Sequence, residues 1–234
     1  MGYVPLFMAV TDQPCVVIGG DVIAEERVRT LRAAGAKVTV ISASLTPGLH
    51  EMAANGTIEY RARALDAGDL TGFMLAYCVD PDRTIAARAV AEARNLGLPI
   101  NVTDRPELCS FIAPAVIKRG RLQIAVSTSG TSPALARILR QELAECFGPP
   151  YELLLTVLAS ARRYLRDHEP DPARRAALAH ALARALRDPL IRDDYATADA
   201  ELRRWIGVGL TDLGIDPTLP PSAVDRLPVT PGSV

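Results

Sequence analysis

The sequence predicts an α/β fold in which a Rossmann-like parallel-sheet domain is followed by a β-hairpin and helix region, and then by a small all-α C-terminal domain. Three observations support this prediction. Short apolar runs alternate with helix-period segments through the first half of the chain. After Asp104 two apolar runs are joined at Arg119-Gly120, as in a hairpin. From Pro149 onward the apolar spacing is helical.

The first half alternates candidate strands with candidate helices. Strands are expected at residues 15–18, 37–41, 57–60, 73–78 and 99–102, and helices at 24–34, 47–54 and 84–96. Gly35 and Gly97 stand where helices commonly end. Such βαβ alternation predicts parallel strands joined by right-handed crossovers.

The second half is expected to begin with an antiparallel hairpin and to continue as helices. The hairpin strands are predicted at residues 110–118 and 121–127. A helix at 134–147 follows, with Ser132 as its N-cap and Pro133 at its first position. Further helices are expected at 151–167, 172–187 and 199–206, the second of them ending before Pro189.

These patterns divide the chain into four segments. We expect a Rossmann-like domain over residues 1–109, a central region over 110–148 and a helical domain over 149–210. Residues 211–234 are rich in proline and small residues, which predicts a disordered tail.

Composition narrows the classes of function. Of the 234 residues 49% are hydrophobic and 23% charged, and the formal net charge is −1, which argues against a nucleic-acid-binding protein. The four cysteines form no C-x-x-C pair and the three histidines no H-x-x-x-H pair, so we expect no metal site built on them. No apolar run has the length of a membrane span and no signal peptide is evident, so a cytoplasmic protein with reduced thiols is expected.

The stretch "CVVIGGDVIAEE" has the form of a dinucleotide-binding strand–turn–helix. Counted without gaps, Gly19 and Ala24 fill the first and third positions of the glycine pattern, but Asp21 fills the second, where a carboxylate repels phosphate. A small change of register would place Gly20 there instead, and a turn without any ligand is the alternative. The candidate cofactor-binding residues are Gly19, Gly20, Asp21, Val22, Ile23 and Ser42.

Ser42 follows the second predicted strand, where dinucleotide-binding domains normally carry an acidic residue. Its hydroxyl can bind a ribose hydroxyl, and the missing carboxylate permits a 2′-phosphate. Asp104 follows the fifth predicted strand, in "NVTDRP". Because ligands bind at the carboxyl edge of open α/β sheets, Asp104 is a candidate general base or metal ligand, and an Asx turn before Pro106 is the alternative.

The hydroxyl-rich loop "STSGTSP" precedes a predicted helix, an arrangement that can bind a phosphate or carboxylate. Simple helix capping by Ser132 is the alternative interpretation, and the two are compatible. The candidate substrate-binding residues are Asn101, Arg119, Ser127, Thr128, Ser129, Gly130, Thr131 and Arg137.

Three features occur in order: "VPLF" before the glycine turn, then "INVTDRPELCSFIAPAVIKRGRLQIAVSTSGTSPALARILRQEL", then a helical region. Together they resemble the precorrin-2 dehydrogenase/sirohydrochlorin ferrochelatase family, which is the siroheme synthase N-terminal module. The resemblance covers residues 3–206. It implies a homodimer, formed through the region at 110–148, that oxidises precorrin-2 to sirohydrochlorin with NAD⁺. Many members then insert Fe²⁺ to give siroheme.

The resemblance also assigns roles to residues. The active-site aspartate of the family falls on Asp104, with transient Fe²⁺ expected near it and no permanent metal site. The family loop falls on "STSGTSP", with Thr128 at a position that is commonly serine. The chain departs from the family at Asp21, where glycine is usual, and at Val79 and Ala86. These departures leave two alternatives open: a chelatase without dehydrogenase activity, and a non-catalytic tetrapyrrole-binding regulator.

Overall fold

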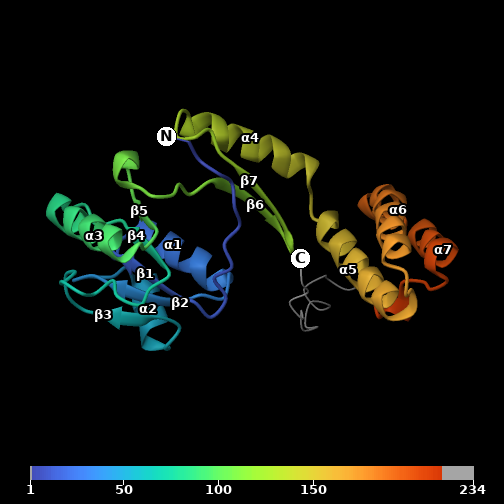
Figure 1. Cartoon of the computed structure of the whole chain (residues 1–234), viewed down its shortest axis with the longest axis horizontal. Coiled ribbons are helices and arrows are strands. Elements are labelled where there is room, and N and C mark those ends of the chain that lie inside the picture. Colours follow the sequence, from blue (N-terminus) through green and yellow to red (C-terminus); the bar gives the residue numbers. More distant parts are fainter. Residues whose placement is uncertain (1, 218–234) are drawn as a thin grey trace. The chain divides into compact units, whose positions relative to one another are not determined.

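The computed structural model describes residues 2–217, which form two compact units. The first unit holds the residues up to Ala113 together with Ser129–Thr131, and the second holds Pro114–Thr128 and the residues from Ser132 onward. Figure 1 colours the first unit mainly blue to green, and the helices of the second unit yellow to red.

A five-stranded parallel sheet forms the centre of the first unit, with the strand order β3-β2-β1-β4-β5. The strands are β1 (Pro14–Ile18), β2 (Lys37–Ile41), β3 (Glu59–Arg61), β4 (Leu75–Cys78) and β5 (Ile100–Val102). The chain adds strands in one direction from β1 to β3 and in the other direction from β4, so the order reverses between β1 and β4. In sheets of this kind ligands bind at that reversal, beyond the carboxyl ends of the strands.

Helices cover both faces of the sheet because its strands carry apolar residues on both sides. Cys15 and Val17 of β1 share one buried cluster with α1 (Val22–Ala33) and α2 (Pro47–Ala54). Val16 and Ile18 share the other cluster with α3 (Arg83–Leu96), which lies on the opposite face (Figure 1). Alternating burial of this kind is what a parallel sheet between two helical layers requires.

The second unit begins with a hairpin and a long helix. Strand β6 (Ala115–Arg119) pairs antiparallel with β7 (Leu122–Val126), and α4 (Pro133–Cys146) follows. Burial here is limited, with Ile117 on β6 and Ala136 on α4 as the buried apolar residues. Ser132 caps α4 by accepting a hydrogen bond from the Leu135 N–H, which confirms the predicted cap.

Three helices complete the second unit: α5 (Pro150–His168), α6 (Pro172–Ile191) and α7 (Tyr195–Ile206). They share a separate apolar core that includes Val157, Leu186 and Leu202, all fully buried. No helix within residues 2–217 is long and apolar enough to cross a membrane.

The structure confirms the predicted fold class and corrects three details of the helical region. Helix α6 continues through Pro189 to Ile191, because Leu190 is buried and a proline in the last turn removes only one hydrogen bond. Helix α7 begins four residues early, since Asp194 caps it by accepting from the Thr197 N–H. The predicted tail also starts too soon, because Thr211–Leu213 forms a 3₁₀ turn and Ile215 is buried. Residues 218–234 of that tail lie outside the described residues.

Candidate functional site

A crevice lies at the carboxyl edge of the sheet, where the strand order reverses. Its volume is about 440 Å³. Its lining comes from the loops that follow β1, β2 and β4: Gly19, Gly20, Asp21, Ser42, Ala43, Ser44, Leu45, Thr46, Val79, Asp80 and Pro81. Four of the six predicted cofactor-binding residues, namely Gly19, Gly20, Asp21 and Ser42, are therefore brought together.

Both glycines of the turn are required by close packing. Gly19 has a φ of +116°, and a Cβ there would lie 2.7 Å from Val79 Cγ2. A Cβ on Gly20 would overlap the main-chain oxygen of Ser44 and lie 2.8 Å from Ser42 Oγ. The Gly20 carbonyl also accepts a hydrogen bond from the Thr46 N–H at 2.9 Å. The turn is thus fastened to the loop that follows β2.

Asp21 is the N-cap of α1. Its Oδ1 accepts a hydrogen bond of 2.8 Å from the Ala24 N–H, and its backbone is extended, with φ −84° and ψ −172°. The carboxylate therefore occupies a donor of the first helical turn, the group that binds phosphate in dinucleotide-binding domains. Gly20 and Asp21 both line the crevice, so the alternative register, with Gly20 at the close-approach position, stays a prediction.

The loop after β2 is held by its own hydroxyl groups. Ser42 is buried and donates to the Ser44 carbonyl at 2.8 Å. Thr46 caps α2 and donates a short hydrogen bond to Glu25 of α1. Hydrogen bonds from Thr46 and Arg29 lower the pKa of the Glu25 carboxyl. This link between α1 and α2 gave no signal in the sequence, because it joins residues 21 positions apart.

Val22 and Ile23, the other two predicted cofactor-binding residues, do not line the crevice. Val22 is exposed at the first position of α1, whereas Ile23 is half-buried and packs against the apolar cluster under α1. Val22 therefore faces solvent, and the contacts of Ile23 are those of a core residue.

Asp104 follows β5 and has a left-handed backbone conformation, with φ +60°. Its side chain is exposed and, within residues 2–217, makes no hydrogen bond or ion pair. Left-handed conformations are uncommon outside glycine, and residues held in them cluster at functional sites. The adjoining Arg105 donates to the Pro81 carbonyl at 3.3 Å, which links the Asp104 loop to the loop after β4 that lines the crevice.

The Asp104 loop is closed by the thiol of Cys109, a residue whose sequence position indicates no site role. Cys109 Sγ accepts a hydrogen bond from the Val102 N–H at 3.1 Å and lies 3.3 Å from the carbonyl oxygens of Val102 and Arg105. Asn101, predicted to bind substrate, donates from Nδ2 to the Phe111 carbonyl at 3.0 Å. Its observed contact is therefore structural. Burial raises the pKa of the Cys109 thiol, so this sulfur stays protonated at neutral pH.

The hydroxyl-rich loop of the second half is ordered by its own contacts. Thr128 Oγ1 donates to the Ser132 carbonyl at 3.0 Å and accepts from the Ser132 N–H at 3.1 Å. Ser129 and Gly130 both have positive φ, at +53° and +80°, so the loop tip is a tight turn with exposed residues. Ser127 and Thr131, also predicted here, are exposed.

The two predicted arginines differ in their surroundings. Arg119 donates to three main-chain carbonyls, those of Lys118, Ala144 and Phe147, at 3.0–3.3 Å. Two of these belong to the end of α4, so the contacts of Arg119 are those of a helix C-terminal cap. Arg137, by contrast, is exposed on the first half of α4.

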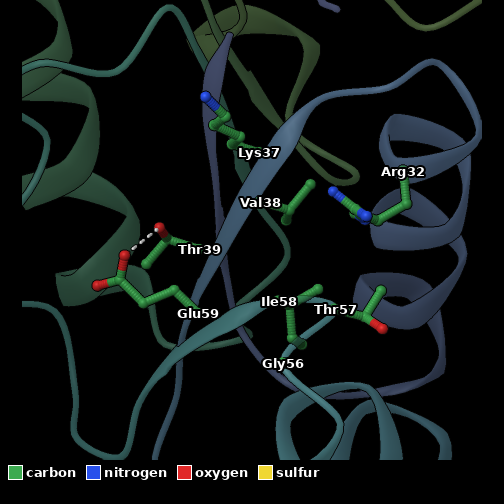
Figure 2. Close-up of a pocket in the computed structure, with 8 residues that line it drawn as sticks. All are labelled: Arg32, Lys37, Val38, Thr39, Gly56, Thr57, Ile58 and Glu59. Atoms are coloured by element: carbon green, nitrogen blue, oxygen red, sulfur yellow. Dashed lines mark hydrogen bonds between the residues drawn. The ribbon is translucent and has the colours of Figure 1, made fainter. Parts of the chain in front are cut away.

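A second pocket, of about 320 Å³, lies beside the beginnings of β2 and β3 (Figure 2). Figure 2 shows Arg32 extending from α1 beside Val38, and the hydrogen bond of 3.2 Å from Thr39 to Glu59. None of the predicted site residues lines it. Among residues 2–217, no three His, Cys, Asp or Glu side chains gather closely enough to hold a metal ion.

Comparison with known proteins identifies the modules of the chain. Residues 6–115 match the family of putative NAD(P)-binding domains, and residues 119–145 match the central region of sirohaem biosynthesis proteins. A siroheme synthase of Methylococcus capsulatus is 39% identical over 175 residues, which cover 75% of this chain and 37% of that protein. This chain is a homologue of the siroheme synthases.

A second relative is similar to this chain over more of its length. A siroheme synthase of Chromobacterium violaceum is 32% identical over 213 residues, or 91% of this chain and 45% of that protein. This siroheme synthase homologue thus spans less than half the length of those curated relatives. The solved structure of SirC, a precorrin-2 dehydrogenase, has the same fold, with a TM-score of 0.71, 20% identity, and coverage of 91% of this chain and 99% of SirC.

Proposed function

We propose that this chain catalyses the NAD⁺-dependent oxidation of precorrin-2 to sirohydrochlorin. The observation that carries the proposal is the position of Asp104, a left-handed residue at the end of β5 whose loop is fastened to the rim of the crevice. The siroheme synthase relatives and the fold shared with SirC support this choice of reaction.

The crevice fits a dinucleotide in three respects. It lies at the reversal of the strand order, the two glycines of the turn line it without side chains, and Ser42 follows β2. Gly19 and Gly20 would lie against the pyrophosphate, and Ser42 beside the adenine ribose. A bound nicotinamide supplies a hydride acceptor.

Asp104 is proposed as the general base. Oxidation of precorrin-2 removes two electrons and two hydrogens, one as hydride and one as a proton. Within residues 2–217 the Asp104 carboxylate has no hydrogen-bond or ion-pair partner. It can therefore accept the proton without first breaking another contact. The Cys109 thiol and the Asn101 amide support this role by closing the loop around it.

The substrate is a polycarboxylate, which requires hydrogen-bond donors and cations. We propose that the loop tip at Ser129, Gly130 and Thr131 and the exposed Arg137 bind its carboxylates. Thr128 and Ser132 hold that loop in shape through their paired hydrogen bonds. Donors at the start of a helix favour anions, which supports this assignment.

Insertion of Fe²⁺ into sirohydrochlorin is a second candidate function. The exposed carboxylate of Asp104 favours it, because a chelatase needs a base for the pyrrole protons and only a weak hold on the incoming ion. Purified chain given sirohydrochlorin and Fe²⁺, without NAD⁺, is expected to form siroheme faster than the uncatalysed reaction. Equal rates with and without protein would rule this activity out.

A homodimer is also proposed. Val116 on β6 and Leu135 and Ile138 on α4 are between 44% and 50% exposed, although they are large and apolar. They lie on two elements that contact each other, β6 and α4, and exposed apolar side chains that adjoin one another commonly mark an interface. Leu135 and Ile138 lie in the segment that matches the sirohaem central family, and Val116 lies on the hairpin strand just before it, which supports assembly through these elements.

The test of the main proposal is an anaerobic incubation of precorrin-2 with the full chain, with and without NAD⁺. Sirohydrochlorin is expected only where NAD⁺ and protein are both present. Tight binding of sirohydrochlorin without any turnover would contradict the proposal. It would favour the alternative that the chain is a non-catalytic tetrapyrrole-binding regulator. Oxygen is excluded so that NAD⁺ is the oxidant supplied to the reaction.

A further inference from the structure

The Asp21 carboxylate stands where the proposed cofactor needs a phosphate site. Its Oδ1 accepts the hydrogen bond of the Ala24 N–H at 2.8 Å, and Asp21 lines the crevice. In a dinucleotide-binding turn, the N–H groups of the first helical turn and the helix dipole attract the pyrophosphate. In this chain the Asp21 carboxylate already accepts one of these hydrogen bonds and lies at the positive end of the helix dipole.

The rest of the crevice lining adds a second negative charge. Asp80, on the loop after β4, lies in the same lining, where its Oδ1 accepts from the Asp82 N–H at 2.9 Å. The eleven lining residues include two aspartates and no lysine or arginine. A pyrophosphate placed in the crevice therefore meets two carboxylates and no side-chain cation from the lining.

The main chain of the glycine turn is held in place, so it cannot shift to make room for a pyrophosphate. Gly20 packs against the Ser44 carbonyl, the Gly19 N–H donates to the Ile41 carbonyl at 2.9 Å, and the Thr46 N–H donates to Gly20. These contacts hold the turn on two sides. Asp21 can consequently make room only by rotating its side chain out of the cap.

We propose that Asp21 is an internal competitor for the pyrophosphate and sets the affinity of this chain for its dinucleotide. The inference rests on the proposed function, since it concerns the same crevice. It predicts that the chain binds NAD⁺ weakly compared with a variant that lacks this charge. The effect is expected to be specific to phosphate, because a carboxylate repels an anion and not the uncharged adenosine.

Asp21→Asn isolates the charge, because asparagine caps helices as well as aspartate does. We expect its dissociation constant for NAD⁺, measured by calorimetry on the full chain, to fall about tenfold or more. Its affinity for adenosine, which has no phosphate, should stay unchanged. Asp171→Asn is the matched control, since Asp171 caps α6 through the Ala173 N–H and lies in the second unit.

The outcomes separate this inference from the proposed function. Equal and measurable NAD⁺ affinities of the wild type and Asp21→Asn would overturn the inference alone. A gain in affinity for adenosine as large as that for NAD⁺ would overturn it too. Binding by Asp21→Asn but not by the wild type would support the inference and contradict an NAD⁺-dependent reaction. Binding by neither would overturn both.

Discussion

At the scale of single residues, the proposed chemistry depends on how Asp104 is held. Its left-handed backbone is fixed by a loop whose closing contacts come from Cys109, Asn101 and Arg105. None of these contacts uses the Asp104 carboxylate itself. Removing the charge of Asp104 should therefore affect the reaction without affecting the loop.

We predict that Asp104→Asn lowers the rate of precorrin-2 oxidation by at least about a hundredfold, the usual contribution of a general base. The melting temperature should not change, because the carboxylate has no partner to lose within the described residues. Glu107→Gln is the control, since Glu107 is an exposed carboxylate on the same loop. Activity of Asp104→Asn close to that of the wild type would refute the assignment of the base.

How far single residues could be predicted depends on whether their contacts are local in the sequence. The strand-end position of Asp104 and the capping by Ser132 follow from local pattern. The thiol of Cys109 and the cap made by Arg119 could not be predicted, because their partners are main-chain groups that only the fold brings near. The same holds for Gly20, whose neighbour Ser44 comes from another loop.

At the scale of elements, the connection between β3 and β4 is stabilised by one buried carboxylate. The Asp69 side chain is 8% exposed and accepts two hydrogen bonds from Arg63, at 2.5 and 2.7 Å, and one from the Asp66 N–H. The hydrogen bonds from Arg63, together with those further contacts and the charge of Arg61, lower the pKa of Asp69 from 3.8 to about 2. A carboxyl with a lowered pKa stabilises the fold when it is ionised.

We predict that Asp69→Asn lowers the free energy of unfolding of the first unit by about 2 kcal/mol at neutral pH, as this pKa shift implies. The stabilisation is complete above the ordinary pKa of 3.8 and is lost as the pH falls towards 2. The difference between wild type and variant should therefore shrink within that interval. Urea unfolding at a series of pH values measures it, and a difference that stays constant down to pH 2 would contradict this explanation.

The elements themselves were largely predictable, and the exceptions have physical causes. Parallel strands and amphipathic helices have a periodic pattern of apolar residues. The bounds of all five strands of the sheet and of its three helices were therefore predicted to within a few residues of the observed ones. Helix α6 passes Pro189 because Leu186 and Leu190 are both buried, a tertiary effect that local preference does not include. Ile215 likewise packs into the apolar core of α5, α6 and α7, although the residues around it show no helical or strand pattern.

At the scale of the whole molecule, three large apolar side chains of the second unit lie at its surface, each between 44% and 50% exposed. Val116, Leu135 and Ile138 belong to the segment that matches the sirohaem central family or to the hairpin beside it. The homodimer proposed above would cover such side chains.

We predict that Ile138→Asp raises the dissociation constant of the homodimer by at least about tenfold, because a charge is costly to bury in an apolar interface. Sedimentation equilibrium measures this constant. Gln141→Asp is the control, since Gln141 is exposed on the same helix and carries no apolar side chain. A monomeric wild type, or a dimer that both variants leave unchanged, would contradict assembly through this surface.

In the proposed reaction the crevice holds NAD⁺ and Asp104 takes the proton as precorrin-2 is oxidised. The most direct test is to measure NADH and sirohydrochlorin in the same anaerobic reaction with the wild-type chain. The proposed reaction predicts that the two products appear together in a one-to-one ratio. Sirohydrochlorin formed without NADH, or no turnover at any NAD⁺ concentration, would contradict it.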